Sequence, residues 1–145
     1  MPAAGDLPDV NLWLALSFGD HIHHASARRY WYGASAARIA FCRVTALGFL
    51  RLSSKARAMG SRPLTVAEAW TAYAAYRRLP EVTLAEEPEG CEAILERWVT
   101  RSRFPPRLLT DAYLAAFARA AGLRLVTFDT DFERFDGLDL LRLEG

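Results

Sequence analysis

The chain has 145 residues, of which 52% are hydrophobic and 24% charged, so it is long enough to form one domain, 1–145, with a sizeable core. Its formal net charge of +1 excludes a strong overall attraction to nucleic acid or membranes, although nearly all its positive residues are arginines, which suit local phosphate contacts. No run approaches the roughly 20 apolar residues of a membrane-spanning helix. Cys42 and Cys91 have no metal-binding spacing, and we expect a reduced, cytoplasmic protein without a membrane partner.

The first half of the chain alternates between short apolar runs and helical patterns. The expected elements are, in order, a strand within 7–10, a helix opening at Asn11, a helix over 20–32 capped by Asp20, a strand over 38–42, and a helix over 43–58. In the last of these helices, four apolar residues are expected to face inward: Val44, Leu47, Leu50 and Ala58.

The second half continues the alternation. Thr65 and Glu68 have the spacing of a capping box, which predicts a helix that ends before Pro80. The later elements are a short strand over 82–84, a helix over 91–101, a helix over 111–122 capped by Thr110 and ended by Gly122, and strands over 123–128 and 138–143. This order predicts a three-layer α/β/α domain with a central, mostly parallel sheet of four to five strands.

Four aspartates fall where such a sheet would gather them. Asp9 follows the first strand, Asp129 and Asp131 follow the fourth, and Asp111 opens a helix. Ligands bind outside the carboxyl ends of parallel strands. Two carboxylates ~4 Å apart repel by roughly 4 kcal/mol at an effective dielectric of about 20, so either some of them are protonated or a metal ion compensates their charge. Oxygen ligands without His or Cys suit Mg²⁺ or Mn²⁺. Taken singly, each aspartate has an ordinary interpretation as a helix-dipole charge, a cap or a turn residue.

Together these segments resemble the PIN domain, in particular the toxins of VapBC toxin–antitoxin pairs. The resemblance covers nearly the whole chain and rests on PDVNLWLAL, DHIHHASARRYW, FCRVTALGFLRL and LLTDAYLAAFARAAGLRLVTFDTDF. The last segment is the most specific, because it joins the helix-start Asp111 to a T-x-D-x-D-F ending at Phe132.

The resemblance implies a metal-dependent endoribonuclease that hydrolyses RNA phosphodiesters. Asp9, Asp111 and Asp129 would hold the metal, with Asp131 assisting. Four supporting residues are implied: Asn11 and Thr45 as hydrogen-bonding groups, Thr127 in a similar role or simply as a strand residue, and Arg51 as a phosphate contact or a plain surface arginine. A VapB-like antitoxin and a homodimer are also implied. Aromatic residues of the first two helices could be core or could line a groove for the antitoxin.

One position departs from the family pattern, because Ala46 stands where a Glu is expected. Alanine cannot coordinate a metal, so the enzyme could be weakened, or the protein could be a silent scaffold that binds antitoxin or RNA, or the alanine could have been introduced. Ala46→Glu is predicted to raise metal affinity. A receiver-like module is disfavoured, since no lysine follows the last strand. His21, His23 and His24 are interpreted as a polar face rather than as ligands.

Overall fold

The computed structural model describes residues 3–55, 62–101 and 103–145 and is built on a five-stranded sheet with the order β3-β2-β1-β4-β5. Every pairing between neighbouring strands is parallel. The strands are β1 (Asp6–Pro8), β2 (Ile39–Phe41), β3 (Val82–Leu84), β4 (Arg124–Thr127) and β5 (Leu140–Arg142). The chain moves outward from β1 in one direction to β2 and β3, and in the other to β4 and β5, so the order reverses between β1 and β4.

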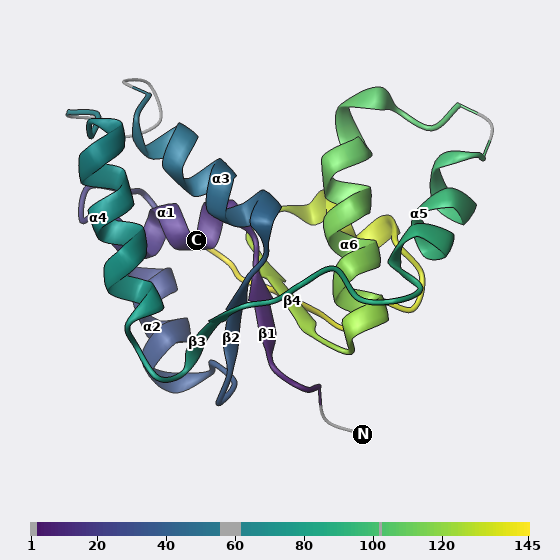
Figure 1. The fold of residues 1–145 in the computed structure, drawn as a ribbon, viewed down its shortest axis with the longest axis horizontal. Helices are drawn as coiled ribbons and strands as arrows, with labels where there is room; N and C mark the ends of the chain where they lie inside the picture. Colours follow the sequence, from purple (N-terminus) through teal and green to yellow (C-terminus); the bar gives the residue numbers. More distant parts are fainter. Residues whose placement is uncertain (1–2, 56–61, 102) are drawn as a thin grey trace.

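Helices cover both faces of this sheet, which confirms the predicted three layers (Figure 1). They are α1 (Val10–Ser17), α2 (His24–Gly33), α3 (Arg43–Ser53), α4 (Val66–Arg77), α5 (Cys91–Val99) and α6 (Leu109–Ala121), with short 3₁₀ turns η2 (Pro106–Leu108) and η3 (Thr130–Arg134). In Figure 1, α5 and α6 lie to the right of the strands and α1 to α4 to the left.

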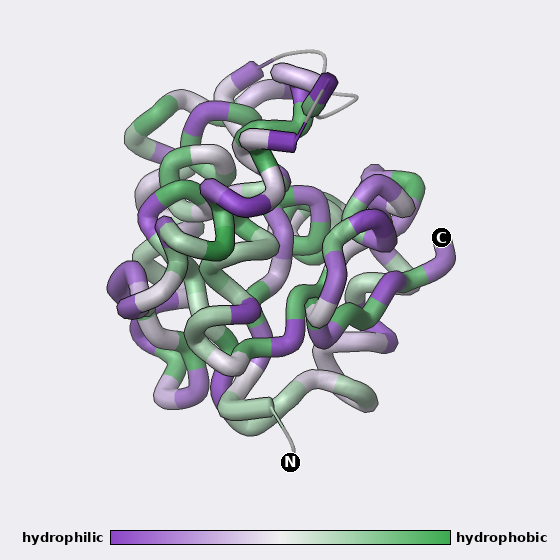
Figure 2. The backbone as a smooth tube through the Cα atoms, turned by 90° about the vertical axis from the view of Figure 1, so that its right-hand side faces the viewer, coloured by the Kyte–Doolittle hydropathy of each residue, from purple (hydrophilic) through white to green (hydrophobic). Residues whose placement is uncertain are grey.

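Alternation along the strands assigns each residue to one helical layer. Leu7, Ala40 and Leu125 pack in the apolar cluster that contains α6 and Trp98 of α5. Their neighbours Ile39 and Phe41 point the other way, into a cluster with α1, α3 and α4. These central strands are therefore apolar on both faces, whereas hydrophobic and hydrophilic residues alternate at short intervals over much of the rest of the chain (Figure 2). No helix among the described residues is long and apolar enough to cross a bilayer.

The start of the chain differs from the prediction at two helix ends. Val10 already belongs to α1, because the carboxylate of Asp9 accepts a hydrogen bond from the Val10 N–H and caps that helix. Asp20 does not cap α2, which begins at His24. The residues before it form a turn instead, in which the His24 N–H donates to the carbonyl of His21.

The inward face of α3 was also predicted incorrectly. Leu47 is 57% exposed, and the buried positions are Thr45, Ala46, Phe49 and Ser53. Of this stripe, Ala46 and Phe49 pack with Phe41 of β2 and Trp13 of α1, and this burial determines the inward face of α3. Val44 and Leu50 are half-buried, and Ala58 lies outside the described residues.

Two of the remaining helix signals are confirmed and one is wrong. Thr65 and Glu68 form the predicted capping box of α4, and Gly122 ends α6 at φ 69°. Thr110 is not the cap of α6, because the 3₁₀ turn η2 runs directly into the helix and places its start at Leu109. Asp111 stays in the first turn of α6 as expected.

Candidate active site

The ends of β1 and β4 lie side by side at the point where the strand order reverses. Pro8 is paired with Val126, and the N–H of Asp9 donates to the Val126 carbonyl across 2.8 Å. Asp9 and Asp129 therefore leave neighbouring strands at the same edge of the sheet. This is the edge at which open parallel sheets bind their ligands.

Thr127 links the two strand ends through its side chain. Its hydroxyl donates to Asp9 Oδ2 across 2.9 Å and accepts from the Asp129 N–H across 3.0 Å and from Asn11 Nδ2 across 3.3 Å. A hydroxyl has one proton and two lone pairs, so Thr127 uses its full capacity and Asn11 must present its NH₂ group to it. Asn11 Oδ1 is left buried without a hydrogen-bond partner among the described residues.

Three carboxylates meet beside this link. Asp111, Asp129 and Asp131 each offer an oxygen atom, and these atoms all lie within 4.8 Å of one another. Asp129 Oδ1 also accepts from the Asp131 N–H across 2.9 Å, which caps η3 and holds the two aspartates in register. Asp131 is thus a full member of the cluster, whereas Asp9 is joined to it through Thr127.

The electrostatics agree with this arrangement. Partial burial raises the pKa of Asp111 to about 6, and the charges of Asp9, Asp129 and Asp131 push it in the same direction. Burial also raises the pKa of Asp9, against the hydrogen bonds from Thr127 and the Val10 N–H, and the charge of Asp129 adds to the rise. The four carboxylates therefore form one electrostatically coupled group.

A single cation in the described structure contacts this group. Arg107 Nη1 lies 3.3 Å from Asp131 Oδ2, and both side chains are well exposed. An exposed pair of this kind offsets little of the repulsion. Sequence reasoning missed Arg107, because its position in η2 next to a proline gives no signal of a partner 24 residues away.

The donor set fits a hard divalent cation. All the available ligand atoms are oxygens, with no histidine or cysteine among them, and such sets favour Mg²⁺ or Mn²⁺. Asp111, Asp129 and Asp131 are placed to hold an ion, with Asp9 next to them.

Two predicted supporting residues lie away from the cluster. The hydroxyl of Thr45 accepts from the Cys42 N–H across 3.0 Å and donates to the Cys42 carbonyl across 3.1 Å, so it serves the cap of α3 and not the aspartates. Arg51 is exposed in the last turn of α3, where its charge complements the helix dipole.

Ala46 is buried in the structure. It is 1% exposed and packs in the apolar cluster with Phe41 and Phe49. One turn of α3 also approaches α1, because a Cβ at Gly48 would lie 2.8 Å from a methyl group of Val10. The interpretation of Ala46 as the position of a missing carboxylate stays a prediction.

Comparisons with known proteins agree with the fold. A model of the PIN domain matches residues 7–138. Ribonuclease VapC41 of Mycobacterium tuberculosis is 42% identical over 139 residues, which cover 92% of this chain and 95% of the relative. Ribonuclease VapC37 of the same organism is 34% identical over 132 residues, covering 90% and 91% of the two chains.

Solved structures share the same architecture. The crystal structure of Mycobacterium tuberculosis VapC20 superimposes with a TM-score of 0.70 at 22% identity, over 94% of this chain and 98% of that one. VapBC2 from Rickettsia felis gives a TM-score of 0.66 at 14% identity, over 95% and 98%. The fold and site define an α/β protein with an acidic cluster at the switch point of a parallel sheet. The chain belongs to the PIN-domain family, in its VapC branch.

Proposed function

We propose that the chain is a divalent-metal-dependent endoribonuclease, the toxin of a toxin–antitoxin pair. The observation that carries this proposal is the meeting of the Asp111, Asp129 and Asp131 carboxylates at the end of the sheet. Relatives that share up to 42% of its residues over nearly their whole length are named ribonucleases. Cys42 and Cys91 are both free thiols, which suits the reducing cytoplasm.

In this proposal each side chain has a distinct task. A bound Mg²⁺ or Mn²⁺ supplies neutralisation of phosphate charge and a lower pKa for water at the site. Asp111, Asp129 and Asp131 hold the ion, and Thr127 keeps Asp9 and Asp129 at a fixed separation. Without a cation, burial and the neighbouring carboxylates raise the pKa of Asp111 to about 6, which shows how strongly the cluster favours a positive charge.

The proposal is tested by measuring RNA cleavage and Mn²⁺ binding on the same preparations. Asp129→Asn should lower cleavage by at least about a hundredfold and weaken Mn²⁺ binding, because it removes one charge from the cluster. Asp136→Asn is the matched control, since Asp136 is exposed and outside the cluster. Cleavage that survives both Asp129→Asn and a chelator would count against the proposal and indicate a contaminating nuclease.

A silent scaffold that binds antitoxin or RNA is the second candidate. One observation favours it: α3 contributes no carboxylate between Arg43 and Ser53, and Ala46 stands where the family pattern predicts a Glu. Mn²⁺ binding by the intact protein without cleavage of any RNA across a range of Mn²⁺ concentrations would select this alternative. Cleavage that is abolished by Asp129→Asn would exclude it.

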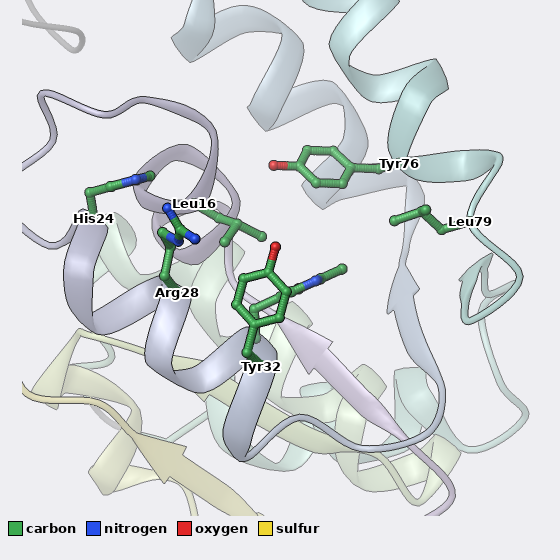
Figure 3. Close-up of a pocket in the computed structure, with 7 residues that line it drawn as sticks. Leu16, His24, Arg28, Tyr32, Tyr76 and Leu79 are labelled. Carbon is green, nitrogen blue, oxygen red and sulfur yellow. The ribbon is translucent and has the colours of Figure 1, made fainter.

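For the partner, we propose that a segment of the cognate antitoxin occupies the groove between α2 and α4. The groove encloses about 380 Å³, and its wall combines aliphatic, aromatic and cationic side chains: Leu16, His24, Arg28, Trp31, Tyr32, Tyr76 and Leu79. Figure 3 shows Tyr32 on one side and Tyr76 and Leu79 on the other, projecting into the space between the helices. Tyr32 is 76% exposed, a large apolar surface for a free chain to leave in water.

Substitution in the groove separates the partner from the catalytic site. Tyr32→Ala with Leu79→Ala should weaken binding of the antitoxin about tenfold or more while RNA cleavage stays unchanged. Val66→Ala with Trp70→Ala, on another exposed apolar surface, is the matched control. The homodimer implied by the family stays a prediction, which sedimentation of the free toxin measures.

A further inference from the structure

A second pocket lies beyond the carboxylate cluster, between the end of α5 and η3. It encloses about 250 Å³ and is lined by three arginines and three aromatic residues, without a carboxylate: Trp98, Arg101, Arg103, Phe104, Arg134 and Phe135. We name it the arginine pocket. It is separate from the groove between α2 and α4 and shares no residue with the carboxylate cluster.

One arginine of this pocket packs on an aromatic ring, and none of the three is paired with an acid in the described structure. The guanidinium of Arg134 lies 5.5 Å from the ring centre of Phe104, and Trp98 and Phe135 pack with their ring centres 4.8 Å apart. Among the residues that the structure describes, none of Arg101, Arg103 and Arg134 has a carboxylate within ion-pair distance. Their charges are therefore available to an anionic ligand.

The pocket is continuous with the candidate active site along the chain. The five-residue turn η3 carries Asp131 near its start and Arg134 at its end, about 6 Å apart at the rise of a 3₁₀ helix. On the other wall, Phe104 is followed within three residues by Arg107, which contacts Asp131. A ligand that reaches the aspartates and extends past η3 therefore meets the arginine pocket next.

We propose that the arginine pocket binds the RNA substrate next to the phosphate that is cleaved, with a backbone phosphate on Arg101, Arg103 and Arg134 and a base against Phe104. The inference rests on the proposed ribonuclease function and deepens it. Planar guanidinium groups match phosphate oxygens, and aromatic faces stack on bases of any sequence. An acidic peptide would also suit the charges, but continuity with the carboxylate cluster favours a chain of phosphates that passes through both.

Arg103 provides an informative variant because its backbone lies in the left-handed region, at φ 65°. Glycine adopts this conformation without strain, so Arg103→Gly removes the guanidinium and leaves the loop its shape. Arg134→Gln removes a second charge on the opposite wall. Arg38→Gln is the matched control, because Arg38 is exposed at the amino end of β2, the opposite edge of the sheet.

The test measures binding of a single-stranded RNA oligonucleotide to the Asp129→Asn protein by fluorescence anisotropy across salt concentrations. Arg103→Gly and Arg134→Gln should each weaken binding about tenfold and lower the slope of log affinity against log salt by about 0.7 for each phosphate that is no longer neutralised. Arg38→Gln should change neither quantity. In the otherwise native enzyme, the two variants should raise KM for a long RNA more than they lower kcat.

The outcomes distinguish this inference from the proposed function. If the native protein cleaves RNA with metal but both arginine variants keep its affinity, salt slope and KM, the arginine pocket is not an RNA site and the ribonuclease proposal stands. If those variants instead weaken the antitoxin complex alone, the pocket binds the partner and the inference is overturned. Failure of the native protein to cleave any RNA overturns the proposed function, whatever the binding measurements give.

Discussion

An aspartate lies at each end of β1, and the two carboxylates have opposite electrostatic surroundings. At the amino end, Asp6 is fully buried and receives Arg124 through two hydrogen bonds of 2.9 and 3.0 Å, together with the Ala36 N–H and the hydroxyl of Tyr30. At the carboxyl end, Asp9 receives only uncharged donors, Thr127 and the Val10 N–H, and lies next to further carboxylates. The first aspartate is neutralised by the chain itself, whereas the second belongs to a group that needs a cation from outside.

This contrast shows what separates a structural carboxylate from a functional one. Burial does not separate them, since Asp6 is fully buried and burial is also the main cause of the raised pKa of Asp9. The arginine separates them. Arg124 binds both oxygens of the buried Asp6 and makes this carboxylate a fixed part of the fold, and the hydrogen bonds to Asp6 raise the pKa of Arg124. Among the described residues, the carboxylate cluster is paired with the exposed Arg107 alone, and negative charge remains for a ligand.

The largest expected effect on stability comes from removing the charge of Asp6 at the amino end of β1. Asp6→Asn should lower the free energy of unfolding by about 3 kcal/mol, because it leaves Arg124 without its counter-charge in a partly buried site. Urea unfolding measures the change, and Asp136→Asn serves as the control. A decrease below about 1 kcal/mol would contradict the assignment of Asp6 as a structural ion pair. Asp6→Leu combined with Arg124→Met should recover much of the stability, since both charges are then removed together.

A second variant tests whether the metal site at the carboxyl end of β1 includes the buried face of α3. Ala46→Glu should destabilise the metal-free protein by about 3 kcal/mol, because the new carboxylate would be buried among Phe41 and Phe49. Leu47→Glu adds the same charge one residue later on the exposed face and should leave stability nearly unchanged. Tighter Mn²⁺ binding by Ala46→Glu would place position 46 in the metal site, and unchanged binding would make it a core position only.

The outcome at α3 illustrates which features the sequence could predict. The alternation of strands and helices, the parallel sheet and the aspartates at its carboxyl edge followed from local patterns, because alternation and chain position determine which edge of a parallel sheet each residue reaches. The buried face of α3 did not follow, since its sequence is apolar on more than one side. Contacts between distant residues, such as Arg107 with Asp131 and Arg124 with Asp6, leave no local signal at all.

Thr127→Val is expected to have a moderate effect on the acidic end alone. Valine keeps the shape of the side chain but removes the hydroxyl that joins Asp9, Asn11 and Asp129, so RNA cleavage should fall about tenfold with little change in KM. The pKa of Asp9 should rise, because the hydrogen bond from Thr127 holds it down, and the acidic limb of the pH–rate profile should move to higher pH. Thr83→Val on β3 is the control. An unchanged pH profile would mean that Thr127 is only a strand residue.

The smallest expected effect is on the stability of the metal-free protein. It measures directly the free energy that the uncompensated carboxylates cost the folded state. The folded state raises the pKa of Asp111 to about 6 from 3.8, so its contribution to stability is fully present below about pH 4 and is lost as pH rises through 6. Asp111→Asn should therefore stabilise the metal-free protein by about 1 kcal/mol at pH 8, after allowance for solvent screening at this partly exposed group. That gain should shrink to nothing as the pH is lowered to 4, whereas Asp136→Asn should give no gain at either pH.

Saturating Mn²⁺ should reverse the order of stabilities, because the ion binds only the folded native cluster tightly. A gain that persists at pH 4 would show that Asp111 is strained for some reason other than its charge, and the contrast between the two ends of β1 would no longer rest on electrostatics.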